Sequence, residues 1–267
     1  MLPALMHATQ VASPFHTKGW VYEEKYDGWR MVALKDKGRV RLVSRNERDH
    51  TKRFPHLVEA LTNLKPASFT LDGEVAVFDE ELVSCFEWLR RAIGPRTGLR
   101  HLNHGDLATP PLYMVFDLLQ LGEKDYRPEP LKARRKALEK LVKGQSLVLP
   151  ARRLMPNGFA AWTEVLHRGW EGYVAKDPES SYTGGRTLKW LKVKVPEYRV
   201  NAGSTIPRRC RNHYEEDDAA MNDPGNWFAL LGVFGLFAIA WALTEINDTL
   251  KGIREAQETL ATSGDDL

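Results

Sequence analysis

The stretch EEKYDGWR, from Glu23 to Arg30, carries more chemistry than a plain strand needs. Its β-branched and aromatic surroundings predict a half-buried strand. Yet a lysine, an aspartate, a glycine and an arginine follow one another between Lys25 and Arg30. A lysine amine is a nucleophile once it has lost its proton, which burial and neighbouring cations favour. Lys25 is therefore a candidate nucleophile, and a solvated surface lysine is the alternative.

The composition is that of a folded globular protein. The chain has 267 residues, of which 43% are hydrophobic and 27% charged, so it can form one large or two small domains. A net charge of +3 does not by itself indicate nucleic acid. The two cysteines, Cys85 and Cys210, form no zinc or disulfide pattern, which favours a reducing compartment. The N-terminus has no pattern of a secretory signal.

Short β-rich runs alternate with helical ones between Trp20 and Lys194. The predicted strands are 29–34, 39–44, 69–78, 112–121, 172–178 and 187–195. The predicted helices are 54–64, 131–143 and 158–169, the last bounded by glycines. Because the order has no strict strand–helix–strand rhythm, we expect an α+β domain with a substantially antiparallel sheet.

Several charged residues on or beside these strands could converge with Lys25 on one site. Glu74 and Glu171 could hold a divalent metal or a ribose hydroxyl, and Phe116 could stack on a base. No phosphate-binding loop of the GxxxxGK[ST] type is present, so a nucleotide would be held in another way. The cations that could neutralise a triphosphate are Arg30, Arg45, Lys176, Lys192 and Lys194.

The order and spacing of these motifs resemble one superfamily. EKYDG is followed by SRN at Ser44–Asn46, LDGE at Leu71–Glu74, YMVFDLL, EGYVAK at Glu171–Lys176 and KWLKVK at Lys189–Lys194. Residues 3 to 200 resemble the nucleotidyltransferase superfamily of ATP-dependent DNA ligases, RNA ligases and capping enzymes. The sequence around these motifs is most similar to the ligase domain of the bacterial end-joining ligase D family. The resemblance implies an adenylation domain, ATP-grasp-like, with antiparallel sheets and flanking helices.

The resemblance also implies a role for each matching residue. Lys25 would attack the α-phosphate of ATP and form a lysyl-AMP, and Glu23 would contact the adenine edge. Phe116 would stack on adenine, and Arg30 would contact the nucleotide or an incoming 5′-phosphate. The remaining expectations are Arg45 on the ribose or DNA phosphate, Glu74 on the ribose and a metal, Glu171 on a metal, and Lys176, Lys192 and Lys194 on the α-phosphate.

The implied reaction is the sealing of nicks or breaks in DNA with ATP as AMP donor and Mg²⁺ or Mn²⁺ as metal. The AMP would pass from Lys25 to a DNA 5′-phosphate, and a 3′-hydroxyl would then displace it. The basic segments 45–53 and 127–136 could follow the DNA backbone, with a solvated surface as the alternative. The sequences of the motifs favour DNA as the substrate, and RNA remains an alternative substrate.

The sequence after Lys194 departs from the family pattern, in which an OB-fold closes over DNA. No strand-rich barrel pattern follows, so sealing could need end-joining proteins or an OB-fold-bearing partner. A ligase relic that binds nucleotide or DNA without sealing is the alternative. We therefore expect an adenylation domain over 1–198, a polar linker over 199–226, an apolar helix over 227–243 and a polar tail over 244–267.

The apolar run 227–243 has no charged residue. At ~1.5 Å per residue it would form a helix of about 26 Å, against a bilayer core of about 30 Å. Tryptophans near both ends and upstream arginines favour a span that would tether a cytoplasmic catalytic domain to the inner membrane face. A buried or partner-packed helix is one alternative, and a foreign tail joined by fusion or frame error is another.

Overall fold

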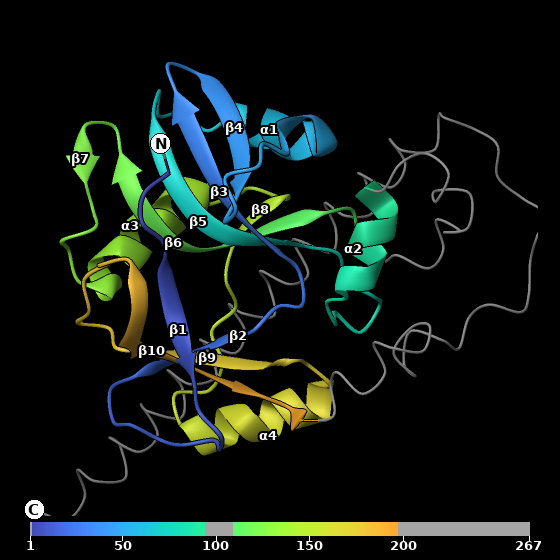
Figure 1. Cartoon of the computed structure of the whole chain (residues 1–267), viewed down its shortest axis with the longest axis vertical. Helices are drawn as coiled ribbons and strands as arrows, with labels where there is room; N and C mark the ends of the chain where they lie inside the picture. The colour runs from blue at the N-terminus through green and yellow to red at the C-terminus, as the bar shows by residue number, and fades with distance from the viewer. Residues whose placement is uncertain (1, 94–108, 197–267) are drawn as a thin grey trace, which may run out of the picture. The chain divides into compact units, whose positions relative to one another are not determined.

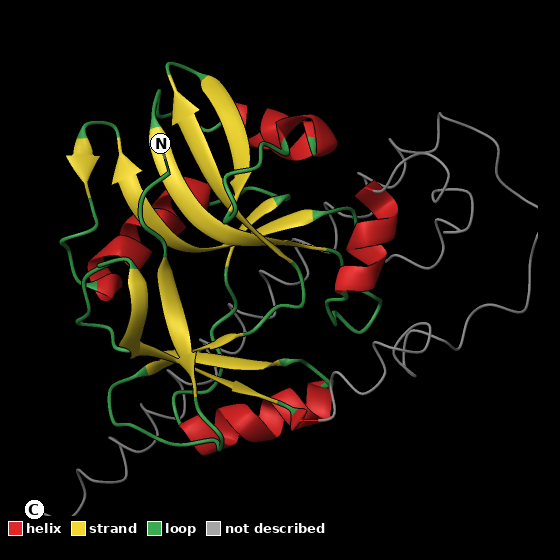
Figure 2. Cartoon of the chain, viewed as in Figure 1, coloured by secondary structure: helices red, strands yellow, loops and turns green. Residues whose placement is uncertain are grey.

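The large sheet carries the motifs LDGE and YMVFDLL on two of its strands. The computed structural model describes residues 2–93 and 109–196, which lie in one compact unit (Figures 1 and 2). The sheet has six strands, ordered β4-β3-β5-β6-β7, with β8 pairing parallel to β6. Its strands are β3 (Trp29–Asp36), β4 (Arg39–Ser44), β5 (Phe69–Ala76), β6 (Leu112–Leu121), β7 (Lys124–Asp125) and β8 (Val148–Pro150).

A smaller sheet of four strands, ordered β1-β10-β9-β2, completes the described sheets. The pairs β10–β9 and β2–β9 are antiparallel, whereas β1 runs parallel to β10. Its strands are β1 (Met6–Gln10), β2 (Val21–Glu24), β9 (Gly172–Lys176) and β10 (Gly185–Lys194). The sheets and helices confirm the predicted α+β class, and most sheet pairs are antiparallel as expected.

The stretch EEKYDGWR, Glu23 to Arg30, is not one strand, contrary to the prediction. Its first residues end β2 in the small sheet, and Trp29 begins β3 in the large sheet. Lys25 to Gly28 therefore form the crossing between the two sheets. A Cβ on Gly28 would stand 2.5 Å from the carbonyl oxygen of Val75, so this close passage over β5 requires glycine.

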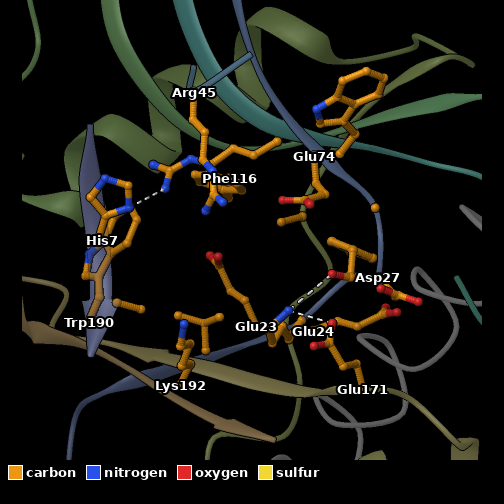
Figure 3. A pocket seen from close by; sticks show the side chains of 18 of the residues that line it. His7, Glu23, Glu24, Asp27, Arg45, Glu74, Phe116, Glu171, Trp190 and Lys192 are labelled. Carbon is orange, nitrogen blue, oxygen red and sulfur yellow. Dashed lines mark hydrogen bonds and ion pairs between the residues drawn. The ribbon is translucent and has the colours of Figure 1, made fainter. Parts of the chain in front are cut away.

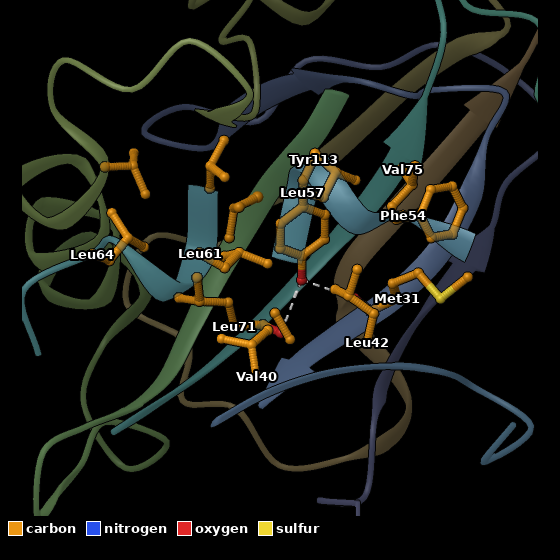
Figure 4. Packing of buried hydrophobic residues seen from close by; sticks show 14 of the residues in the cluster. Met31, Val40, Leu42, Phe54, Leu57, Leu61, Leu64, Leu71, Val75 and Tyr113 are labelled. Carbon is orange, nitrogen blue, oxygen red and sulfur yellow. Dashed lines mark hydrogen bonds between the residues drawn. The ribbon is translucent and has the colours of Figure 1, made fainter. Parts of the chain in front are cut away.

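The core of the large sheet explains the positions of two helices. Apolar residues of α1 (Pro55–Thr62) and α3 (Leu131–Val142) recur at helical spacing and pack on the sheet. In Figure 4 the ring of Tyr113 lies within this cluster. Its hydroxyl is 2.9 Å from the carbonyl oxygen of Met31 and 3.0 Å from that of Leu71, so the one phenol bridges β3 and β5. This pairing fixes the strands that carry Arg30 and Glu74.

The remaining helices flank the sheets at other places. Helix α4 (Gly158–Arg168) packs on β9 and β2, beneath the small sheet in Figure 1. It begins where the Asn157 side chain accepts from two backbone amides and ends at Gly169, whose φ of 72° suits glycine. A short 3₁₀ helix η1 (Thr51–Arg53) and helix α2 (Phe86–Ile93) lie in connections. The predicted helix boundaries are thus confirmed to within two residues.

The predicted tail lies outside the described residues. This applies to the linker 199–226, the apolar run 227–243 and the segment 244–267, so the expected helix and membrane tether stay predictions. Among the described helices, none has the length and apolar character that crossing a bilayer requires.

Two arginines predicted on the basic, solvated face of α3 are in fact buried. Arg134 forms a bidentate ion pair with Asp117 of β6, at 2.7 and 2.8 Å, with both side chains fully buried. Its Nη1 also donates to the carbonyl oxygens of Glu129 and Ser180. Because each buried charge is paired, the helix is fastened to the sheet by an interaction that fails if either partner is removed.

We expect Arg134→Met to lower the free energy of unfolding by about 3–5 kcal/mol, because it leaves the carboxylate of Asp117 buried without its partner. Urea unfolding at neutral pH measures this loss. Lys136→Met, an exposed position on the same helix, is the matched control and should change stability by less than about 0.5 kcal/mol. Equal stabilities of the two variants would contradict the structural role of the pair.

Candidate active site

A pocket of about 670 Å³ opens where the chain crosses between the two sheets (Figure 3). The small sheet contributes residues of β1, β2, β9 and β10, and the large sheet contributes β3, β5 and β6 together with the segment after β4. Every site residue predicted from the sequence lines this pocket: Glu23, Lys25, Arg30, Arg45, Glu74, Phe116, Glu171, Lys176, Lys192 and Lys194. The structure thus brings together motifs that are up to 171 positions apart (194 − 23).

Lys25 lies on the pocket floor, held at backbone and side chain. Its amide donates to the carbonyl oxygen of Gly172 at 3.0 Å. Its Nζ is 2.5 Å from Oε2 of Glu171, and Nζ of Lys194 is 2.6 Å from the other oxygen of the same carboxylate. Glu171 therefore holds two lysines together at one point, with both amines part-exposed to the pocket.

Glu23 is buried at the end of β2, and both its carboxylate oxygens are engaged. Nζ of Lys176 lies 2.5 Å from Oε2, and Nη1 of Arg135 lies 3.2 Å from Oε1. Sequence reasoning missed Arg135, since it placed this arginine on the solvated side of its helix. The signal that could have found it is its spacing from Leu131 and Leu138, four and three positions away on the buried side.

Arg30 has most of its donors occupied inside the protein. Its guanidinium pairs with both oxygens of the buried Asp72, at 3.0 and 2.7 Å, and donates to the carbonyl oxygen of Met6. Nη1 lies 3.4 Å from Nδ1 of His7, a pocket residue that the sequence analysis did not name. The expected contact of Arg30 with a nucleotide or a 5′-phosphate therefore depends on the edge that faces His7, and it stays a prediction.

Aromatic rings form one side of the pocket. The ring centroids of Phe116 and Trp190 are 6.0 Å apart in an edge-to-face arrangement. Nζ of Lys176 lies 4.8 Å from the Phe116 centroid and 4.2 Å from that of Trp190, and the Arg30 guanidinium lies 5.3 Å from Phe116. The face of Phe116 is thus near the Lys176 and Arg30 cations, in a position compatible with stacking on a base.

The cations at the pocket mouth repel one another. Burial lowers the pKa of Lys192, and the nearby charges of Lys25, Lys194 and Arg186 lower it further. Figure 3 shows Lys192 of β10 and Arg45, which directly follows β4, on either side of the pocket. Such a set of like charges favours a polyanion between the two sheets.

Glu74 differs from the other pocket carboxylates because no hydrogen bond or ion pair with another described residue engages it. Burial raises its pKa to about 7, although Lys25 and Arg30 oppose this shift. An unpartnered carboxylate fits a divalent cation, whereas Glu171 already holds two lysines. The described residues contain no cluster of three or more His, Cys, Asp or Glu that could hold a metal alone.

The sequence of the chain matches a known family over the same region. The model of the ATP dependent DNA ligase domain family matches residues 1–194. The chain belongs to the ATP-dependent DNA ligase family. The family that the order of the motifs predicted is thereby confirmed.

Individual relatives agree with this assignment. The chain is 33% identical over 198 residues to the multifunctional non-homologous end joining protein LigD of Pseudomonas aeruginosa, covering 73% of this chain and 22% of that protein. It is 32% identical over 237 residues to DNA ligase C of Mycobacterium tuberculosis, covering 82% and 63%. The chain therefore spans less than two thirds of the length of these ligases.

A solved ligase structure is similar as well. The structure of a mycobacterial DNA ligase D complexed with ATP and MES has a TM-score of 0.59 and 32% sequence identity to this chain. The match covers 72% of this chain and 60% of that structure. Mixed sheets with flanking helices are therefore the fold of this ligase domain, in agreement with the predicted architecture.

We expect Glu74→Gln to stabilise the ligase domain at high pH only. Because folding raises the pKa of Glu74 from 4.5 to about 7, the folded state keeps a proton that the unfolded state releases, and stability falls as pH rises through this window. Removing the group should add on the order of 1 kcal/mol to the free energy of unfolding at pH 8 and almost nothing at pH 5.

Urea unfolding at the two pH values measures this difference. Glu59→Gln, an exposed glutamate on α1, is the matched control and should show no pH-dependent gain. A Glu74→Gln protein that follows the wild type at both pH values would show that Glu74 is not held in a costly charged state.

Proposed function

We propose that residues 1–198 form the adenylation domain of an ATP-dependent DNA ligase and that the protein seals nicks or breaks in DNA. The observation that carries this proposal is the position of Lys25 beside Glu171 and Lys194, in a pocket that Phe116 and further cations also line. Membership of the ligase family and similarity to an ATP-bound ligase D structure support it.

The first step is attack of Nζ of Lys25 on the α-phosphorus of ATP. A nitrogen–phosphorus bond forms, the bond to the β-phosphate oxygen breaks, and pyrophosphate leaves. Lys25 must first lose a proton and separate from Glu171, whose carboxylate is the nearest acceptor. Lys194, released from the same carboxylate, then stabilises the negative charge that develops on the α-phosphate.

The other pocket residues bind and orient the nucleotide in this proposal. Phe116 stacks on the adenine, and Glu23 contacts its edge. Lys176 and Lys192 face the α-phosphate, and Arg45 contacts the ribose or the DNA phosphate. Glu74 would hold Mg²⁺ or Mn²⁺, which supplies charge neutralisation for the phosphates when bound. In this proposal all these groups surround one bound ATP.

Two further transfers complete the proposed reaction. The AMP passes from Lys25 to a DNA 5′-phosphate, forming a phosphate–phosphate anhydride and freeing the lysine. The 3′-hydroxyl of the neighbouring strand then attacks that 5′-phosphorus and expels AMP. Arg30 and Arg45, which both line the pocket, contact the incoming phosphate in this proposal. End-joining proteins, or a partner carrying an OB-fold, are the proteins we propose to act with this chain on DNA.

The direct test of the first step is incubation with α-labelled ATP and Mg²⁺, a denaturing gel and peptide mapping. We expect covalent label on Lys25 and its complete loss in Lys25→Ala, because the proposal assigns the attack on ATP to this lysine. Lys18→Ala, at an exposed position outside the pocket, should be labelled as the wild type is. A folded, ATP-binding wild type without label would favour the alternative, a protein that binds nucleotide without sealing.

The later steps are tested with a nicked duplex carrying a 5′-phosphate. We expect the wild type to seal nicked DNA with ATP, and Lys25→Ala to seal only a nick whose 5′-phosphate already carries AMP, since the last step does not need the lysine nucleophile. Measuring the joined strand on a sequencing gel separates the cases. Joining of nicked RNA but not of nicked DNA would replace the proposed substrate by RNA.

A further inference from the structure

Arg135 approaches the nucleotide pocket from behind, and no motif includes it. It lies on α3, packed against the large sheet, with its side chain 5% exposed. Its guanidinium makes three contacts: Nη1 to Glu23 at 3.2 Å, Nη2 to the carbonyl oxygen of Ala151 at 2.6 Å, and Nε to Glu139 at 2.6 Å. One side chain thus links a pocket carboxylate to a helix and to a neighbouring backbone segment.

That backbone segment borders the strand on which Glu23 lies. Glu23 pairs with Val174 of β9 on one side and forms an isolated bridge with Arg153 on the other. The amide of Glu24 donates to the carbonyl oxygen of Arg152 at 3.0 Å. By binding both Ala151 and Glu23, Arg135 fastens the edge of β2 and the Glu23 side chain at the same time.

The two cations on Glu23 leave one lone pair on each carboxylate oxygen able to accept a further hydrogen bond. Each carboxylate oxygen has two lone pairs, and Lys176 and Arg135 use one on each oxygen. Glu23 lines the pocket, and Figure 3 shows its side chain among the pocket residues. Because the carboxylate can only accept, a base with an N–H group at its edge fits this position and a base without one leaves it unpaired.

We propose that Arg135 is a positioning residue for base recognition: by fixing Glu23 from α3 it sets the preference of the pocket for a purine with an exocyclic amine. The proposal rests on the proposed function, in which Glu23 contacts the adenine edge. Arg135 does not touch the nucleotide. Without it, Glu23 keeps only Lys176 and loses the tie to Ala151, so its carboxylate takes up other orientations.

The test compares the binding of ATP with that of purine riboside triphosphate, which lacks the exocyclic amine, by calorimetry without metal. We expect the wild type to bind ATP about tenfold more tightly, the value of one hydrogen bond to a charged group. In Arg135→Met this preference should fall to within about twofold, mainly through weaker ATP binding. A general structural defect would weaken both nucleotides equally, so the ratio isolates positioning.

Four further proteins complete the experiment. Glu23→Met, which removes the acceptor, should lose the preference to the same extent, and adding Arg135→Met to it should change the ratio no further if Arg135 acts through Glu23. Lys136→Met, exposed on the same helix, should keep the wild-type ratio. Arg135→Lys carries the test if Arg135→Met does not fold, and its shorter reach should also reduce the ratio because lysine cannot form the fork to Glu23 and Ala151.

An unchanged ratio in folded Arg135→Met, or a wild type that binds both nucleotides equally, would overturn the proposal. The outcome is separate from the labelling of Lys25. If Lys25 is labelled but the wild type binds ATP and purine riboside triphosphate equally, the role of Arg135 is overturned and the ligase proposal stands. If the wild type prefers ATP through Arg135 but Lys25 is not labelled, the role of Arg135 is supported and self-adenylation is overturned.

Discussion

The passage of the chain from one sheet to the other between Glu24 and Trp29 is the constraint on which the pocket depends. Four residues span this distance, so Lys25 has no freedom to lie elsewhere than on the floor between the sheets. Gly28 allows the chain to pass over β5, and the amide of Lys25 is tied to the carbonyl of Gly172. The opposing walls of the pocket follow from this crossing, because each sheet contributes its own motifs to it.

Charge balance is the second requirement of the pocket. Glu171, Glu23 and Asp72 each engage cations that would otherwise face one another across a partly buried space. Buried charges are tolerated only when paired, so the carboxylates stabilise the pocket without nucleotide. In the proposed reaction, phosphate oxygens take the place of Glu171 beside the lysines. The same ion pairs therefore stabilise the fold and prepare the site for a polyanion.

Glu74 and Arg135 illustrate two different uses of burial. Glu74 keeps a partly buried carboxylate unpaired by any described residue, and burial raises its pKa. In our proposal it holds the cation that arrives with the nucleotide. Arg135 is fully paired and works through Glu23 in our proposal. The helix α3, fastened by the pair of Arg134 with Asp117, supports the pocket from the outside. Stability and base recognition are thereby linked through one helix.

The sequence by itself determined six of the strands and the bounds of three helices, because alternation and helical spacing are local properties of the chain. The motif order, through the family resemblance, also gave ten of the residues that line the pocket. Strand alternation puts Lys192 and Lys194, two positions apart, on one face of β10, and both line the pocket. Only the tertiary structure decided that EEKYDGWR is divided between two sheets, that Arg134 and Arg135 are buried, and that His7 faces Arg30. These features depend on partners far apart in the chain, such as Arg135 with Glu23 and Lys25 with Glu171. Composition and periodicity state which residues can be buried or charged, whereas the pairing of two distant side chains is set by how the two sheets pack.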